Sequence, residues 1–181
     1  ILGFGVPPQQ LGIGASFRYK DFNAGFLIEG KSGGQIYSGT NNRLIGYGLH
    51  QMTVPAGGRE AGLVPDGVLE DGSVITQSIP MAQQGAYWGR YNDAAEAGVR
   101  DSDYMRLRSL SFGYTFPSDM LEGTFLQSAS VSLIGRNLFF ISNDVENVDP
   151  ESAYASNNSQ GLEFQGMPVP RTIGLNVNLK F

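Results

Sequence analysis

The sequence has 181 residues, 25 of them glycine and none cysteine, and carries a net charge of −5 with only 16% charged residues. This length suits one domain, and the absence of cysteine excludes disulfides and cysteine-based metal or redox centres. A negative charge without a basic run argues against a nucleic-acid partner, and no stretch approaches the ~18 apolar residues of a membrane helix.

Two segments near the start alternate apolar and small or polar residues, which predicts a pair of strands. The first covers 11–19 (LGIGASFRY), and Lys20–Asp21 then forms a tight turn. The second begins at FNAGFLIEG, and we expect it to continue across a kink at KSGG as one strand over 22–38. A separate strand over 35–50 is the alternative, but it would place the tight turn at the same end as the long loops.

A long polar segment over 40–103, rich in glycine, asparagine and aspartate, follows these strands and is predicted to be a loop. Within it, NNRLIGYGLHQM is expected to form a short helix or coil. Three more alternating segments predict strands over 104–116, 128–141 and 168–181, and a break in the period near Gly135 indicates a bulge. A second long loop is expected over 143–167.

The connections between these five strands are unequal in length. If 22–38 is one strand, both short turns fall at one end of the sheet and both long loops at the other. Outer-membrane β-barrels have this asymmetry, with short periplasmic turns and long extracellular loops. Five strands cannot close such a barrel, which needs at least eight, so the chain is predicted to be an all-β, antiparallel wall segment of a larger transmembrane barrel.

The alternation also predicts which side of the wall meets lipid. In the last strand the apolar residues occupy one face and the small polar residues the other. We expect an outward, lipid-facing set (Phe112, Tyr114, Ile173, Leu175, Val177, Leu179) and a lumenal set (Ser111, Asn176, Asn178).

The loops hold the candidate binding residues. Tyr87, Trp88, Arg90 and Tyr91 (in AYWGRYND) combine flat aromatic faces with a charged group, a pattern that suits sugar rings. Packing of the loop on itself or contact with a partner protein is the favoured alternative. Four aspartates, Asp66, Asp71, Asp144 and Asp149, could supply oxygens to calcium, but their spacing does not match an EF-hand, and Asp-Gly is first of all a turn signal.

Three further residues have side chains that could serve special roles. His50 is the single histidine, and the absence of a Gly-x-Ser-x-Gly elbow argues for a loop histidine instead of a catalytic one. Arg106 and Arg108 lie near the outer end of the strand over 104–116, where lipid headgroups or loop carboxylates are the expected partners. No catalytic residue, cofactor or dedicated metal site is predicted, and the protein is not expected to be an enzyme.

Several strings carry a family resemblance over nearly the whole chain: FRYKDFNAGFLIEGKSGGQIYSG, YGLHQMT, DGVLEDG, YMRLRSLSFGYTFP, GRNLF, DPES and PRTIGLNVNLKF. In this order they resemble the C-terminal part of the SusC/RagA family of TonB-dependent outer-membrane transporters. The resemblance implies a barrel of 22 strands, and it implies that the signal peptide, the TonB-contacting box and the plug domain lie outside this chain. The first residues, ILGFGVPPQQ, show no start methionine or leader pattern, so we expect an interior point of a longer chain there.

The resemblance also implies a function. Such transporters sit in the bacterial outer membrane with their loops outside, and they import oligosaccharides or sometimes oligopeptides. A SusD-like surface lipoprotein acts as a lid, TonB supplies energy through the plug, and a terminal aromatic residue, here Phe181, resembles the barrel-assembly signal. Two alternatives stay open: a non-transporting outer-membrane surface or adhesin-like β protein, and a soluble β-sandwich.

Overall fold

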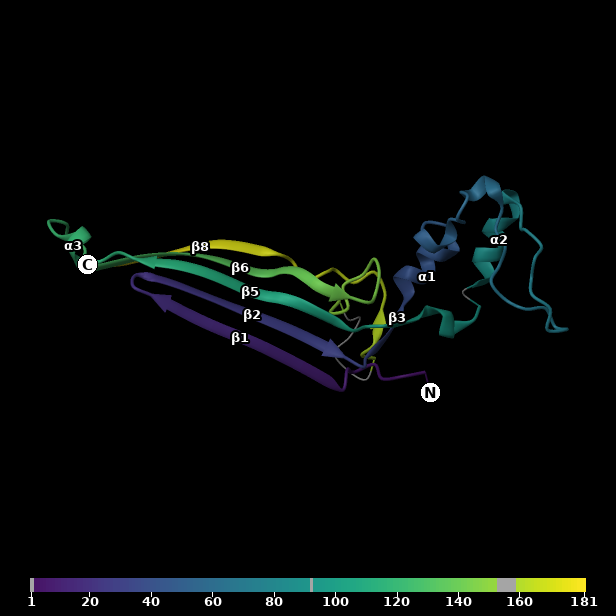
Figure 1. Ribbon diagram of the computed structural model, residues 1–181, viewed down its shortest axis with the longest axis horizontal. Helices are drawn as coiled ribbons and strands as arrows, with labels where there is room; N and C mark the ends of the chain where they lie inside the picture. The colour runs from purple at the N-terminus through teal and green to yellow at the C-terminus, as the bar shows by residue number, and fades with distance from the viewer. Residues whose placement is uncertain (1, 92, 153–158) are drawn as a thin grey trace.

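The computed structural model describes residues 2–91, 93–152 and 159–181, and it forms an elongated molecule with a long sheet at one end and helical loops at the other (Figure 1). Neighbouring strands of the sheet are antiparallel, in the order β1-β2-β5-β6-β8. Among the described residues these five long strands are β1 (Gln9–Tyr19), β2 (Phe22–Ser32), β5 (Tyr104–Thr115), β6 (Ser128–Asn143) and β8 (Thr172–Lys180). The predicted all-β, antiparallel architecture is confirmed, and in the described part of the chain β1 and β8 are edges that do not pair with each other.

The second strand is shorter than predicted. β2 ends at Ser32, because Gly33 takes a positive φ of 79° and its N–H donates to the Asp103 carboxylate instead of extending the ladder. The following residues form β3 (Gln35–Ser38), which pairs with β4 (Val99–Asp101) and β7 (Leu162–Glu163) in a separate small sheet. The expectation of one kinked strand over 22–38 is therefore wrong.

The last strand also begins later than expected, at Thr172 instead of residue 168. Pro168 and Pro170 precede it, and proline has no backbone N–H to donate to a ladder. The ends of the sheet nevertheless differ in the predicted way. The Lys20–Asp21 turn and the connection containing α3 (Ser118–Leu121) lie at one end, and the long connections after β2 and β6 lie at the other (Figure 1).

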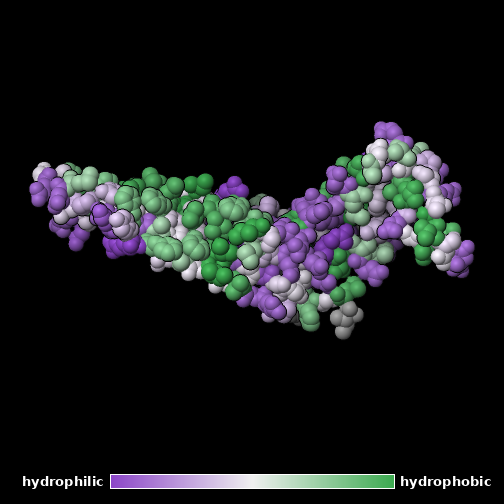
Figure 2. Space-filling view, in the orientation of Figure 1, coloured by the Kyte–Doolittle hydropathy of each residue, from purple (hydrophilic) through white to green (hydrophobic). Residues whose placement is uncertain are grey.

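One face of the sheet is apolar across all five strands. A single register row crosses the sheet through Phe17, Ala24, Phe112, Leu133 and Leu175. Leu175 is 69% exposed and Phe112 is 55% exposed, so this face has no partner within the chain. Figure 2 shows hydrophobic residues gathered over the middle of the sheet, between hydrophilic residues at the turn end and at the base of the long loops.

The opposite face carries small and polar side chains. Its register row runs through Arg18, Asn23, Gly113, Ser132 and Asn176. The residues predicted to face lipid and those predicted to face the lumen thus lie on opposite faces of the sheet, as the alternation requires.

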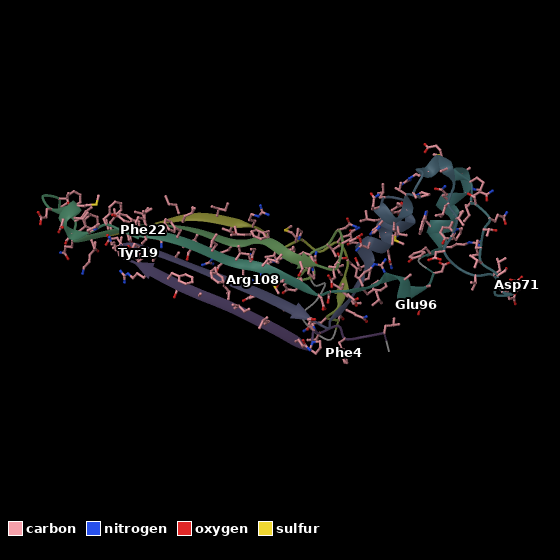
Figure 3. All side chains as sticks on the ribbon, viewed as in Figure 1. Phe4, Tyr19, Phe22, Asp71, Glu96 and Arg108 are labelled. Atoms are coloured by element: carbon pink, nitrogen blue, oxygen red, sulfur yellow. The ribbon has the colours of Figure 1, made fainter. Side chains whose placement is uncertain are left out.

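Aromatic rings gather where the short turns lie. Phe22 contacts Tyr114 with ring centroids 4.8 Å apart, and Figure 3 shows Phe22 beside Tyr19 at this end. Phe181 stacks on Phe125 of the α3 connection at 5.6 Å and an interplanar angle of 8°. Aromatic girdles of this kind mark the membrane boundaries of outer-membrane barrels. The role of Phe181 as an assembly signal stays a prediction.

The long connection after β2 folds into a helical layer beyond the sheet (Figure 1). It contains α1 (Gly39–Gly46), η1 (Gln51–Thr53), η2 (Arg59–Ala61), α2 (Met81–Tyr91) and η3 (Ala95–Gly98). The short helix expected within 41–52 is present as α1, which begins where the Ser38 hydroxyl accepts a hydrogen bond from the Asn41 N–H at 3.1 Å. In the parts of the chain that the structure describes, no helix is both long and apolar enough to cross a membrane.

Candidate functional site at the loop end of the sheet

A cluster of charged residues on the polar face holds the second long loop against the sheet. We call it the arginine clamp, and it consists of Arg106 and Arg108 of β5, Glu29 of β2, and Asp149 and Glu151 of the loop. Arg106 donates to Asp149 and to Glu151 at 2.6 Å each. Arg108 donates to Glu151 and to Glu29, also at 2.6 Å. The sequence predicted either lipid headgroups or loop carboxylates as partners of Arg106 and Arg108. In the structure both arginines bind loop carboxylates.

A β-bulge explains how Arg106 and Arg108 lie on the polar face, although they are in phase with Leu110 and Phe112 of the apolar face. Leu107 pairs with Phe139, whereas Ser109 pairs with Arg136, so Asn137 and Leu138 together oppose Arg108. Asn137 takes a positive φ of 51°, which asparagine tolerates better than most residues. The bulge predicted near Gly135 lies here. Leu27 of β2 pairs with Ser109 and Ile28 pairs with Leu107, so the alternation of β5 shifts at Arg108. Arg106 therefore lies opposite Glu29 on the polar face.

The clamp is more buried toward Arg106 than toward Arg108. Arg106 is only 2% exposed, and its guanidinium carbon lies 3.9 Å from the centroid of the Phe140 ring. Burial alone would raise the pKa of the Glu151 carboxyl, but hydrogen bonds from Arg108 and Tyr104 and the two arginine charges together hold this pKa below its usual range. Glu151 therefore stays ionised, and the loop is fixed by charge-assisted hydrogen bonds.

A second junction joins the two long loops through Glu163, which is completely buried. Its carboxylate accepts hydrogen bonds from the Ser38 hydroxyl at 2.9 Å and from the Thr40 hydroxyl at 2.6 Å. It also accepts the Thr40 N–H in the first turn of α1, where the helix dipole favours negative charge. These donors compensate for burying the carboxylate and tie β7 to the start of α1.

His50 and Asn41 form a third junction between the loops. The Nδ1 atom of His50 accepts a hydrogen bond from the Met52 N–H, and its Nε2 lies 3.5 Å from the Glu146 carboxylate. Asn41 donates to the Glu146 carbonyl at 2.9 Å and accepts from the Asn147 amide at 3.0 Å. His50 is thus a structural residue that joins the two loops.

The predicted aromatic ligand residues all lie on α2 but have two different environments. Trp88 is 6% exposed and packs against Tyr87 and Tyr91, with ring centroids 4.9 and 5.5 Å away. Tyr87 and Tyr91 are half-buried, and Arg90 is exposed. Together with Ile79, Gln83 and Ala86, these three residues line a hollow of ≈ 670 Å³, which Trp88 does not line.

The four calcium candidates do not come together. Asp71 lies at the far tip of the first loop, well away from Arg108 (Figure 3). The Ser73 hydroxyl and then the Ser73 N–H lower its pKa, as in an ordinary Asx turn. The carboxylate of Asp149 pairs with Arg106, and Asp66 and Asp144 are exposed. Over residues 2–91, 93–152 and 159–181, no group of three or more acidic or histidine residues could hold a metal ion.

The clamp predicts a dependence on pH that replacing Glu151 should remove. Because the pKa of Glu151 is lowered in the folded protein, its stabilising contribution is complete above the ordinary carboxyl range and is lost as the pH falls through the lowered pKa. In the full-length protein we expect amides of 144–152 to lose protection from hydrogen exchange only in acid. Glu151→Gln should lower this protection about tenfold at neutral pH. The control Asp144→Asn changes an exposed side chain of the same loop, and equal protection in both variants would contradict the assignment.

Comparison with known proteins gives relatives over the whole chain. "TonB-dependent receptor P3" and "TonB-dependent receptor P26" of Formosa agariphila are 28% and 27% identical to it over 187 aligned residues, which cover 100% of the chain. The chain spans only 17% and 18% of the length of these two receptors. A scan against models of protein families found no match.

The fold is similar to that of solved structures. The RagAB peptide importer in the "closed-closed" state matches with a TM-score of 0.65 and 16% identity, over 98% of this chain and 18% of that chain. The same importer in the "open-open" state matches with a TM-score of 0.64 and 17% identity, over 97% of this chain and 17% of that chain. The predicted resemblance to SusC/RagA-like TonB-dependent transporters is confirmed, and the relatives are receptors and importers, not enzymes.

Proposed function

We propose that this chain is a wall segment of a TonB-dependent importer in the bacterial outer membrane. The observation that carries the proposal is the continuous apolar face of the five-stranded sheet, with short turns at one end and long loops at the other. A soluble protein rarely exposes so wide an apolar surface, whereas a barrel wall needs it to meet lipid. The similarity to TonB-dependent receptors along the whole chain supports the same function.

The two ends of the sheet give the wall its orientation. The helical layer and the second loop face the outside of the cell, and the α3 connection faces the periplasm, as short turns do in such barrels. The edges β1 and β8 pair with strands contributed by the rest of the protein, since an unpaired edge is not tolerated in lipid. By the family resemblance, the full barrel has 22 strands around a plug, and TonB acts through that plug.

We propose oligosaccharides as the imported substrates, with oligopeptides as the alternative, and a SusD-like lipoprotein as the partner at the outer face. The aromatic hollow on α2 favours sugars, because the CH faces of sugar rings are apolar and stack on tyrosine rings. The structurally similar RagAB is named as a peptide importer, and this is the reason to test both classes of substrate.

The function can be tested by uptake in the bacterium that carries the full-length protein. Deleting the gene is expected to abolish uptake of a fluorescently labelled oligosaccharide and to leave uptake of a monosaccharide that crosses porins unchanged. Collapsing the proton gradient should have the same effect, since TonB-driven import needs energy from the inner membrane. Normal uptake of every oligosaccharide and peptide tested in the deletion strain, although the parent strain carries the protein in its outer membrane, would support the adhesin-like alternative instead.

A further inference from the structure

The hollow on α2 is built from residues on one side of the helix. Gln83, Tyr87 and Tyr91 are spaced four residues apart, and such residues lie above one another on a helix surface. Ala86 and Arg90 flank this row and line the same hollow. The helix lies in the helical layer, away from the sheet (Figure 1), so the hollow belongs to the loop surface and not to the barrel wall.

Contacts on the buried side of α2 hold the residues that line the hollow in place. Trp88 packs edge-on against Tyr87, with an interplanar angle of 76°, and at 59° against Tyr91. On the buried side, the Gln84 amide donates to the Arg59 carbonyl at 2.9 Å. The Arg59 guanidinium in turn donates to the Gly48 carbonyl just beyond α1. Both tyrosine rings are therefore positioned before any ligand arrives, which lowers the entropic cost of binding.

We propose that this hollow is an outer binding subsite for a neutral oligosaccharide, an inference that rests on the proposed import function. The two tyrosine rings, one helical turn apart, offer a platform for successive sugar rings, and Ile79 extends the apolar floor. Gln83 and Arg90 supply the donors and the amide oxygen that sugar hydroxyls need. Small-molecule sites usually consist of an apolar floor with a few polar groups around it.

The net charge of the loop disfavours a polyanionic ligand. Arg90 is the only basic residue between positions 60 and 98, whereas this stretch carries six carboxylates: Glu60, Asp66, Glu70, Asp71, Asp93 and Glu96. Polyanionic sugars, such as those rich in uronate, would approach a loop whose net charge has their own sign, which disfavours their binding. One arginine provides hydrogen bonds to hydroxyls but does not offset that field.

The test measures binding to the purified full-length protein by titration calorimetry. The probes are short linear oligosaccharides of glucose, xylose and mannose, an oligouronate of similar length, and an uncharged peptide. Tyr87→Ala and Tyr91→Ala are each expected to raise the Kd for the neutral sugar that binds by about tenfold, and Arg90→Gln to raise it several-fold. Tyr47→Ala is the matched control, because Tyr47 is a tyrosine of the same loop that is 73% exposed and does not line the hollow.

A filling variant keeps the test valid if a tyrosine change disturbs α2. Ala86→Met leaves both rings in place and obstructs the hollow, so it should weaken binding as strongly as Tyr87→Ala. The proposal is overturned if no neutral oligosaccharide binds, if the hollow variants bind like wild type, or if the oligouronate or the peptide binds more tightly. Unchanged binding in the hollow variants, with uptake that still depends on the gene, would remove the subsite and leave import standing, whereas normal uptake after deletion of the gene would refute the import proposal itself.

Discussion

Replacing Leu175 with arginine is expected to lower the folding equilibrium constant of the full-length protein in the outer membrane by roughly 30-fold or more, and to reduce the yield of folded protein. Leu175 lies in the middle of β8, on the apolar face, opposite Leu133. An arginine on the lipid face of a barrel costs about 2–4 kcal/mol at the membrane midplane, and each 1.4 kcal/mol is a factor of ten in an equilibrium. The guanidinium group could reach water from this position only if the barrel wall were distorted.

The neighbouring position supplies the control. Asn176 occupies the next position on the same strand, pairs with Ser132, and lies on the opposite, polar face. Asn176→Arg should leave the folded fraction within a factor of about two of wild type, since a lumenal charge stays hydrated. The folded fraction can be measured by heat-dependent mobility of outer-membrane extracts in gel electrophoresis. Equal losses for the two variants would show that the apolar face does not meet lipid.

The long strands could be predicted because each one repeats its alternation many times. In β8, apolar residues occupy every second position from Ile173 to Leu179, so the two faces are fixed by the period alone. β3 and β7 have only four and two residues, which is too short for a period to be visible. Gly33 could be taken for a kink within a strand, and only its positive φ reveals a strand end.

The junctions between the loops could not be predicted, because their partners are far apart in sequence. Ser38 and Glu163 are 125 residues apart, and Arg106 and Glu151 are 45 residues apart. No spacing rule connects such pairs. The sequence suggested loop carboxylates for Arg106 and Arg108 in general terms, but Glu29 and Glu163 were missed entirely.

The aromatic segment 87–91 shows a further limit of predicting a binding site from the sequence. Composition alone placed Tyr87, Trp88, Arg90 and Tyr91 together as one candidate binding surface. On a helix, successive residues turn by about 100°, so Trp88 points away from the row formed by Tyr87 and Tyr91. The helical phase, with Gln84 and Trp88 as the buried residues of α2, was the signal that could have separated the packing residue from the exposed ones.

Breaking the arginine clamp at its buried end is the second large effect that we expect. Arg106→Met should raise amide exchange over 144–152 by roughly 100-fold or more, because it leaves the 4% exposed Asp149 side chain without its counter-charge, and such a loss costs about 3–5 kcal/mol. The double variant Arg106→Met/Asp149→Asn removes the orphaned charge and keeps an acceptor for the Val169 N–H, so exchange should return to within about tenfold of wild type.

Arg136→Met, which changes an exposed arginine of β6, is the control and should have little effect. Hydrogen exchange with mass spectrometry on the full-length protein would measure all three variants. If the single and double variants loosened the loop equally, the cost would come from lost packing of Arg106 on Phe140, not from a buried unpaired charge.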